Sequence, residues 1–185
     1  MSEKPLIIIG AGTSTIEIID LIEDINKKST NKIKIIGILD DNKNLLNKKI
    51  SNTPVIGNIK EMKKFKKENF FLGIQSYKNR FKRSEFINLI KDNIKRFKSI
   101  IHPSSLIASS AKIGYGCLIA NNTNIYSGSS IGNFCNIGTN VTISGGTSGT
   151  SATINSFDTA TATTTVGAAV DTDGTEIVVV ADTSA

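Results

Sequence analysis

The chain has 185 residues, of which 39% are hydrophobic and 21% charged, a composition that suits one ordinary domain or two small ones. Its apolar runs, such as Leu6–Ile9 and Ile177–Ala181, are far shorter than the roughly 18 residues of a membrane span, and no secretory signal is visible, so we expect a cytoplasmic protein. All 22 Lys and Arg residues lie between Lys4 and Lys112, which gives residues 1–112 a net charge of +11 and the remainder −5; because the lysines are dispersed, we expect a solvated surface and no nucleic-acid partner.

Residues 1–98 alternate between strand and helix patterns. The strand Leu6–Ile9 ends in Gly10-Ala11-Gly12, and an apolar face at helical spacing follows it. The residues of that face are Ile16, Ile18, Ile19, Ile22 and Ile25. Ser14 and Glu17 fit a helix capping box.

Further elements follow in the same alternation. We expect strands over 33–39 and 69–74, a turn at 54–57, and helices over 59–67 and 79–91. This order predicts an α/β domain with a small parallel sheet covered by helices.

Residues 99–144 contain a six-residue repeat. Isoleucine recurs at every sixth position, and a small residue stands two positions before each one. The repeated residues are Ile101, Ile107, Ile113, Ile119, Ile125, Ile131, Ile137 and Ile143. A period of six suits neither an α-helix nor a hairpin, but it suits a coil in which each hexad forms one flat strand and a bend. We therefore predict a short parallel β-helix of a little under three coils.

Residues 145–185 differ sharply in composition. They are rich in Thr, Ala and Gly, contain no basic residue, and place Gly149 where the next repeated Ile is due. We interpret them as an atypical, weakly structured polar tail of different origin, in which only Thr175–Val180 resembles a strand.

Few residues of the chain suggest chemistry by themselves. The Gly10–Gly12 turn is either a phosphate site at a helix N-terminus or simply a tight turn, and Thr15 replaces the third glycine of a dinucleotide fingerprint. Asp40 could accept hydrogen bonds from a ribose or sugar hydroxyl, or it could be a helix cap or a solvated acid in a loop. The single histidine, His102, opens the repeats, which favours a structural or interface role over that of a general base.

The two cysteines, Cys117 and Cys135, occupy the small position of their hexads, which favours inert packing. They are too few for a disulfide framework and lack the spacing of zinc ligands, so we expect no metal site.

Taken together and in order, five short motifs resemble one family. They are Gly10-Ala11-Gly12, Leu39-Asp40-Asp41, Pro54-Val55-Ile56-Gly57, Phe71-Leu72-Gly73-Ile74, and Ile101-His102-Pro103-Ser104 before the hexads. Over residues 5 to about 144 the chain is similar to sugar O- and N-acetyltransferases of the NeuD/PglD type, which include sialic-acid O-acetyltransferases and the UDP-sugar N-acetyltransferase of bacillosamine synthesis. The resemblance implies a Rossmann-like domain, a left-handed β-helix of hexapeptide repeats, and a homotrimer with acetyl-CoA as co-substrate.

The resemblance also assigns residues. It implies that substrate phosphates face Gly10, Ala11, Gly12 and Thr13, that Asp40 and Asp41 approach the sugar or base of a nucleotide-sugar, and that Gln75 and Ser76 line the same cleft. In the family, a catalytic histidine stands two residues after the eighth repeated aliphatic residue. This chain has Gly145 there, so we assign no catalytic residue.

These observations favour an acetyltransferase by descent that lacks its base and the later coils that bind acetyl-CoA. A non-catalytic module that binds a nucleotide-sugar or forms trimers remains the alternative. An oxidoreductase built on the glycine turn is disfavoured, because Thr15 interrupts the dinucleotide fingerprint.

Overall fold

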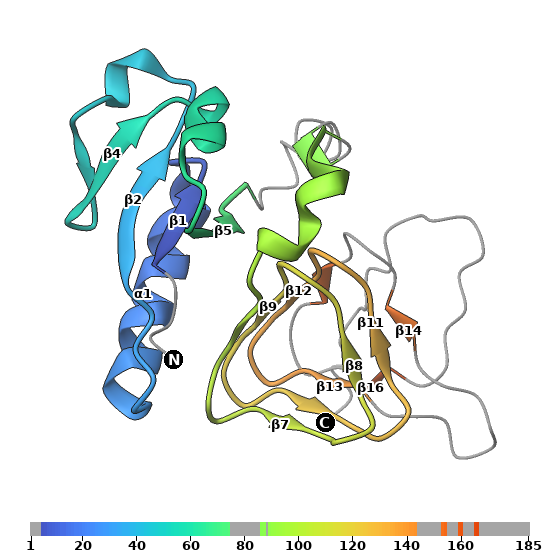
Figure 1. Ribbon diagram of the computed structural model, residues 1–185. Coiled ribbons are helices and arrows are strands. Elements are labelled where there is room, and N and C mark those ends of the chain that lie inside the picture. The colour runs from blue at the N-terminus through green and yellow to red at the C-terminus, as the bar shows by residue number, and fades with distance from the viewer. Residues whose placement is uncertain are drawn as a thin grey trace. The chain divides into compact units, whose positions relative to one another are not determined.

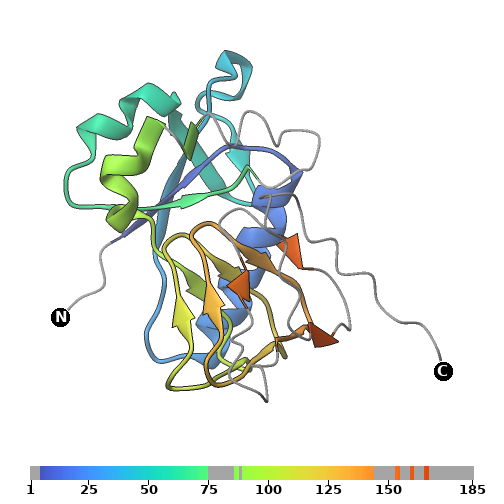
Figure 2. The ribbon, with the colours of Figure 1, turned by 90° about the vertical axis from the view of Figure 1, so that its right-hand side faces the viewer.

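The structure is a computed structural model that describes residues 5–74, 86–87 and 89–143, together with three short strands between residues 153 and 166 (Figures 1 and 2). The chain divides into two units, Met1–Lys98 and Ser99–Ala185. Each unit has its own sheet system, and each is described separately below.

The first unit is mixed α/β and is built on one five-stranded sheet. Its strands are β1 (Leu6–Ile9), β2 (Ile35–Leu39), β3 (Lys49–Ile50), β4 (Thr53–Gly57) and β5 (Asn69–Leu72). They lie in the order β3-β4-β2-β1-β5, and all neighbouring pairs are parallel except β3 with β4. The expected parallel sheet is confirmed, but the stretch expected as a turn at 54–57 is a strand. It became one because the Ser51-Asn52 turn, with positive φ at both residues, folds β3 back onto it.

Helix α1 (Thr13–Lys28) follows β1 and buries one face. The buried residues are Thr15, Ile18, Ile19, Ile22 and Ile25. Ile16, which we expected on this face, is 43% exposed. At 100° per residue it lies on the opposite side from Ile18 and Ile25, so the face is centred on Ile18 and Ile22.

The described part of this unit also contains three 3₁₀ helices, η1 (Lys43–Leu45), η2 (Ile59–Lys64) and η4 (Lys91–Arg96), and helical residues at 86–87 and 89–90. The helix expected over 59–67 is therefore shorter, and it begins at a capping box formed by Asn58 and Glu61. Arg96 fixes the segment after η2, because its guanidinium donates to the carbonyl oxygens of Phe65 and Glu68. Most of the helix expected over 79–91 lies outside the described residues.

The second unit is a parallel β-helix. Its two-residue strands are β6 (Ile100–Ile101), β7 (Leu106–Ile107), β8 (Lys112–Ile113), β9 (Leu118–Ile119), β10 (Asn124–Ile125), β11 (Ser130–Ile131), β12 (Asn136–Ile137), β13 (Thr142–Ile143), β14 (Thr153–Ile154), β15 (Thr159–Ala160) and β16 (Thr165–Val166). They form three parallel sheets, ordered β16-β13-β10-β7, β14-β11-β8 and β15-β12-β9-β6. Each strand pairs with the one three places earlier in the chain, so three hexads make one turn, as Figure 1 shows.

The coil continues beyond residue 144, where the sequence analysis ended it. Strands β14, β15 and β16 pair in register with β11, β12 and β13. The residues paired with Ile131, Ile137 and Ile143 are Ile154, Ala160 and Val166. They resume the six-residue spacing after a step of eleven from Ile143. The repeat is thus interrupted by five extra residues rather than ended. The strand expected at 175–180 lies outside the described residues.

The repeated isoleucines form the interior of the coil, but the first coil differs from the others. Every repeated Ile from Ile119 to Ile143 is buried, whereas Ile107 and Ile113 are only partly buried and Ile101 is 38% exposed. In this unit β6, β7 and β8 are edge strands with a neighbour on one side only. An inward side chain there contacts just one further layer, which explains why the isoleucines of the first coil are less buried than the later ones.

Inward polar side chains connect successive coils. At the small position of the hexad, Ser99 Oγ donates to Gly114 O at 2.7 Å, Ser105 Oγ to Ala120 O at 2.7 Å, and Thr123 Oγ1 to Gly138 O at 2.8 Å. Each bond spans fifteen residues and joins one coil to the next. The small position is therefore a site of hydrogen bonding as well as of tight packing.

None of the helices in the described part of the chain has the length and apolar character that a membrane crossing requires.

The burial gradient along the isoleucines predicts different costs for the same substitution. Ile125→Val should lower the free energy of unfolding of this unit by about 0.5–1.5 kcal/mol, because it leaves a small cavity in a fully buried layer. Ile107→Val, at the edge of the same sheet, should cost less. Urea denaturation of both variants measures the difference, and equal costs would contradict the layered interior.

Candidate functional site

The turn between β1 and α1 requires glycine at its first position. Gly10 has φ +97°, a region that side chains other than glycine rarely adopt. A Cβ there would also stand 2.7 Å from Cγ1 of Ile74. Its amide donates to Leu39 O at 2.8 Å, which holds the turn at the carboxyl end of the sheet. In parallel α/β sheets, this end is where ligands bind.

Gly12 leaves the beginning of α1 open. It is the N-cap residue, with φ −78° and ψ −177°, and no side chain caps the helix. A Cβ at Gly12 would meet nothing within 4 Å. The amides of Thr13 and Ser14 lie in the first turn and so have no intrahelical acceptor, which makes them donors for an anion.

The expected capping box of Ser14 and Glu17 does not form. The helix begins at Thr13, so Ser14 is its second residue rather than its N-cap, and the first turn contains no acidic residue. A serine inside the first turn cannot present its hydroxyl to the amides that follow it in the way an N-cap does. The helix N-terminus therefore keeps its positive end unneutralised by its own side chains.

Two side chains brace the turn from opposite sides. Thr15 Oγ1 donates to Gly10 O at 2.7 Å, and Asp40 Oδ2 accepts the amide hydrogen of Ala11 at 2.7 Å. The other oxygen of Asp40, Oδ1, accepts from Asn42 N at 2.7 Å. Both oxygens of Asp40 are therefore engaged with backbone, and the carboxylate ties the end of β2 to the glycine turn.

Thr15 on helix α1 lies close to Gly73, which follows strand β5, and this pair differs from the corresponding contact in a dinucleotide-binding fold. Thr15 is completely buried, and a Cβ on Gly73 would stand 2.6 Å from its Oγ1. In the dinucleotide fingerprint, a third glycine at the helix allows close packing of helix and strand. Here the glycine stands after β5 and the larger residue on the helix, so close packing is preserved with the two residue sizes reversed.

This contact predicts that substitutions at Gly73 and Thr15 have coupled effects on stability. Gly73→Ala should destabilise the first unit by roughly 1–3 kcal/mol, because the added methyl group would clash with Thr15 and Ile8. Adding Thr15→Ala should recover part of that loss, whereas Gly12→Ala should be nearly neutral because nothing lies near its Cβ position. Thermal denaturation of these three variants and of Thr15→Ala alone tests this, and strict additivity of the Gly73→Ala and Thr15→Ala changes would refute the contact.

The remaining residues assigned from the sequence do not form one cluster. Asp41 is exposed, and its Oδ1 accepts from Ile59 N at 3.0 Å, which positions the start of η2. Gln75, Ser76 and Gly145 lie outside the described residues. The structure thus brings together Gly10, Ala11, Gly12, Thr13 and Asp40.

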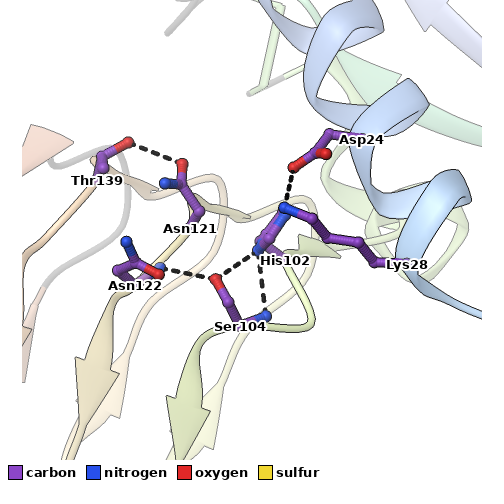
Figure 3. Close-up of polar contacts among 7 residues, drawn as sticks. All are labelled: Asp24, Lys28, His102, Ser104, Asn121, Asn122 and Thr139. Carbon is purple, nitrogen blue, oxygen red and sulfur yellow. Dashed lines mark hydrogen bonds and ion pairs between the residues drawn. The ribbon is translucent and has the colours of Figure 1, made fainter.

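His102 has a defined environment at the first corner of the coil. Its side chain is buried, and Nδ1 accepts the amide hydrogen of Ser104 at 3.1 Å and lies 2.7 Å from Ser104 Oγ (Figure 3). That hydroxyl oxygen in turn accepts from Asn122 N at 3.0 Å. Because the Nδ1 lone pair is used by the turn, the neutral ring carries its proton on Nε2. This arrangement agrees with a structural role for His102.

The same corner continues in the next coil. Thr139 Oγ1 donates to Asn121 Oδ1 at 3.0 Å (Figure 3). Asn122 and Asn140 both have positive φ. Asparagine adopts this region more readily than most residues. The corner is therefore lined by polar side chains and held by bonds between coils. Within the residues that the structure describes, no group of three or more His, Cys, Asp or Glu side chains could hold a metal ion.

Sequence reasoning missed both braces of the glycine turn. Thr15 was judged as a missing glycine, although its position one turn before Ile18 and Ile19 on the buried face of α1 indicates that it points inward. The bond from Ala11 to Asp40 joins residues 29 positions apart. No local pattern encodes such a contact, because it depends on the pairing of β1 with β2.

Part of the chain matches a known protein family. Residues 5–87 match the family model of the PglD N-terminal domain. No curated protein sequence matches the chain significantly.

Several solved structures share the fold of the chain. The acetyltransferase domain of PglB from Neisseria gonorrhoeae is 20% identical, with a TM-score of 0.57 over 92% of this chain and 94% of that one. A structure of the same domain in complex with acetyl coenzyme A has a TM-score of 0.56 at 20% identity, over 90% of this chain and 86% of that one.

A histidine variant of perosamine N-acetyltransferase from Caulobacter crescentus, in complex with CoA and GDP-perosamine, is 17% identical with a TM-score of 0.56, over 88% of each chain. At these identities the likeness establishes the fold. The family match shows that residues 5–87 of this chain are similar to the PglD N-terminal domain.

Proposed function

We propose that this chain descends from acetyl-CoA-dependent sugar O- and N-acetyltransferases acting on a nucleotide-sugar or a sialic-acid-type sugar. In this proposal the first unit is Rossmann-like and binds the sugar substrate, and the β-helix is left-handed. The match of residues 5–87 to the PglD N-terminal domain supports it. So do relatives of the same fold that bind acetyl coenzyme A, or CoA together with GDP-perosamine.

The observation that carries the proposal is the open beginning of α1. The free amides after Gly12 and the absence of any side chain at Gly12 leave room for a phosphate against the helix N-terminus. A phosphate group of the substrate would rest on the segment Gly10–Thr13. The amide of Ala11 already bonds to Asp40, so Gly12 and Thr13 supply the main contacts.

Asp40 and Asp41 follow the same sheet edge and are proposed to meet the sugar or base. Each carboxylate oxygen has two lone pairs, so Asp40 can still accept a hydroxyl hydrogen while bracing the turn. Asp41 uses one oxygen on Ile59 N and exposes the rest of its carboxylate. Gln75 and Ser76 are proposed as further substrate contacts on the resemblance alone.

The residue at position 145 bears on catalysis. Gly145 stands where the family resemblance places the general base, so we propose that acetyl transfer is impaired. This absence favours the alternative function, a non-catalytic module that binds a nucleotide-sugar or forms trimers.

The charge of the coil also affects how strongly acetyl-CoA can bind. Between residues 99 and 143, Lys112 is the only side chain with a full charge, so few cations are available there for the CoA phosphates. The co-substrate is therefore proposed from the resemblance, with weak binding expected.

The same depletion of charge suits a subunit interface. Leu106, Tyr115 and Tyr126 are 54%, 43% and 47% exposed on this unit, and interface cores are enriched in Tyr and depleted in charged residues. We propose a cytoplasmic homotrimer. Light scattering of the purified chain tests it, with three times 19.8 kDa expected, and a monomer at micromolar concentration would refute it.

Titration calorimetry with UDP- and GDP-linked amino sugars, sialic acid, acetyl-CoA and NAD tests the proposed function. We expect binding of a nucleotide-sugar, weak or no binding of acetyl-CoA, and none of NAD. Binding of NAD in preference to the nucleotide-sugars would instead favour a dinucleotide enzyme. Failure of every nucleotide-sugar and of sialic acid would refute the substrate assignment.

A further inference from the structure

Cys117 and Cys135 stand one above the other in consecutive coils. Strands β9 and β12 pair in register, with Leu118 opposite Asn136, and the amide of Leu118 donates to Cys135 O at 2.9 Å. The residues just before these strands are the two cysteines. Neighbouring strands lie about 4.8 Å apart, which falls within the range of about 4.4–6.8 Å between the Cα atoms of a disulfide.

Both thiols lie inside the coil and share one environment. Cys117 and Cys135 are 0% and 1% exposed and belong to the same apolar cluster as the inner isoleucines. Cys117 Sγ donates to Gly132 O at 3.0 Å, across fifteen residues. This is the bond that Ser99 makes to Gly114 in the preceding coil, so the thiol replaces a hydroxyl that connects coils.

The Cys117 thiol is also affected by its neighbour. A hydrogen bond from the Cys135 side chain lowers the pKa of the Cys117 thiol, although burial opposes the shift. This shift favours the thiolate of Cys117, which is the reactive form of cysteine. The proposed sugar chemistry uses neither residue.

We propose that Cys117 and Cys135 are a redox modification site and form an intramolecular disulfide when hydrogen peroxide oxidises the protein. The Cys117 thiolate attacks one peroxide oxygen, the O–O bond breaks, and hydroxide leaves, which gives a sulfenic acid. Cys135 sulfur then attacks Cys117 sulfur, the S–O bond breaks, and the departing hydroxide takes up a proton. Two thiols and one peroxide thus become one disulfide and two waters. The oxidant is small and neutral, so a local opening of the coil admits it.

The disulfide would close a loop over residues 117–135 and bind two coils covalently. A closed loop restricts the unfolded chain, so the oxidised protein should resist denaturation better than the reduced protein. This gain in stability should be confined to the second unit.

Intact mass and thiol alkylation test the proposal directly, because the chain contains only these two cysteines. The native protein is treated with hydrogen peroxide, unfolded, and alkylated with iodoacetamide. We expect a single chain that is lighter by two hydrogens, takes up no alkyl group, and regains two after dithiothreitol. Its urea midpoint should lie above that of the reduced protein.

Serine variants provide the matched controls. Cys117→Ser keeps a donor for Gly132 O and should fold, yet it should take up one alkyl group and form no disulfide within the chain. In glutathione buffers, the effective concentration of the two thiols should be at least about tenfold higher in the folded protein than in urea. Two alkylated thiols after oxidation, addition of oxygen atoms without a disulfide, dimers linked between chains, or equal effective concentrations would each overturn the proposal.

Discussion

Acetyl transfer by this chain is expected to be about 10² to 10⁴ times slower than by a Gly145→His variant, the factor that general-base help usually contributes. Glycine has no side chain to take the proton from an attacking amine or hydroxyl. The measurement is thiol release from acetyl-CoA in the presence of UDP-amino sugars or sialic acid.

Two variants control this expectation. Gly146→His adds the same imidazole one position later and should not accelerate the reaction, because a base must lie within hydrogen-bond reach of its proton. His102→Ala should leave the residual rate unchanged, since His102 is buried and its Nδ1 accepts from Ser104. Rapid turnover by the parent chain that disappears in His102→Ala would assign the base to His102 instead.

A Gly12→Val variant is expected to lose roughly 10- to 100-fold in affinity for the nucleotide-sugar while it keeps its thermal stability. Loss of one hydrogen bond to a charged group costs about 1.5–3 kcal/mol, which corresponds to this range. Stability should be kept because a Cβ at Gly12 would meet nothing within 4 Å, and its φ of −78° suits any residue.

Gly10→Val is the matched control for this variant. Its φ of +97° and the contact of 2.7 Å with Ile74 predict loss of stability as well as of binding. Calorimetric titration and thermal denaturation of both variants distinguish a loss of ligand access from a loss of stability. Unchanged affinity in Gly12→Val would place the ligand elsewhere.

The parts of the fold that sequence predicted best are those with a short period. The isoleucine ladder indicated a coil because a six-residue spacing has few structural solutions, and β10–β13 confirm it. The ladder was nevertheless judged to end at Ile143. Counting along the sequence in steps of six loses the repeat when five extra residues are inserted. In the structure, backbone pairing of Ile154 with Ile131 restores the register.

The site could be predicted only in part. Gly10 and Gly12 were found from their place between an apolar run and a helical face, which is a local pattern. The brace between Ala11 and Asp40 could not be found, because it forms only after β1 and β2 have paired. The edge strand β3 was missed for a similar reason, since its two residues gain their order from β4.

The stacking of coils has a mechanical consequence. Each coil of the described β-helix pairs only with its neighbours, so a chain pulled from its C-terminal end should leave the stack one coil at a time. A regular coil of 18 residues, as from Ile125 to Ile143, would release roughly 60 Å of extended chain. The coil from Ile137 to Ala160 contains the five extra residues, so its force–extension step should be the longer one and should mark its place in the sequence of rupture events.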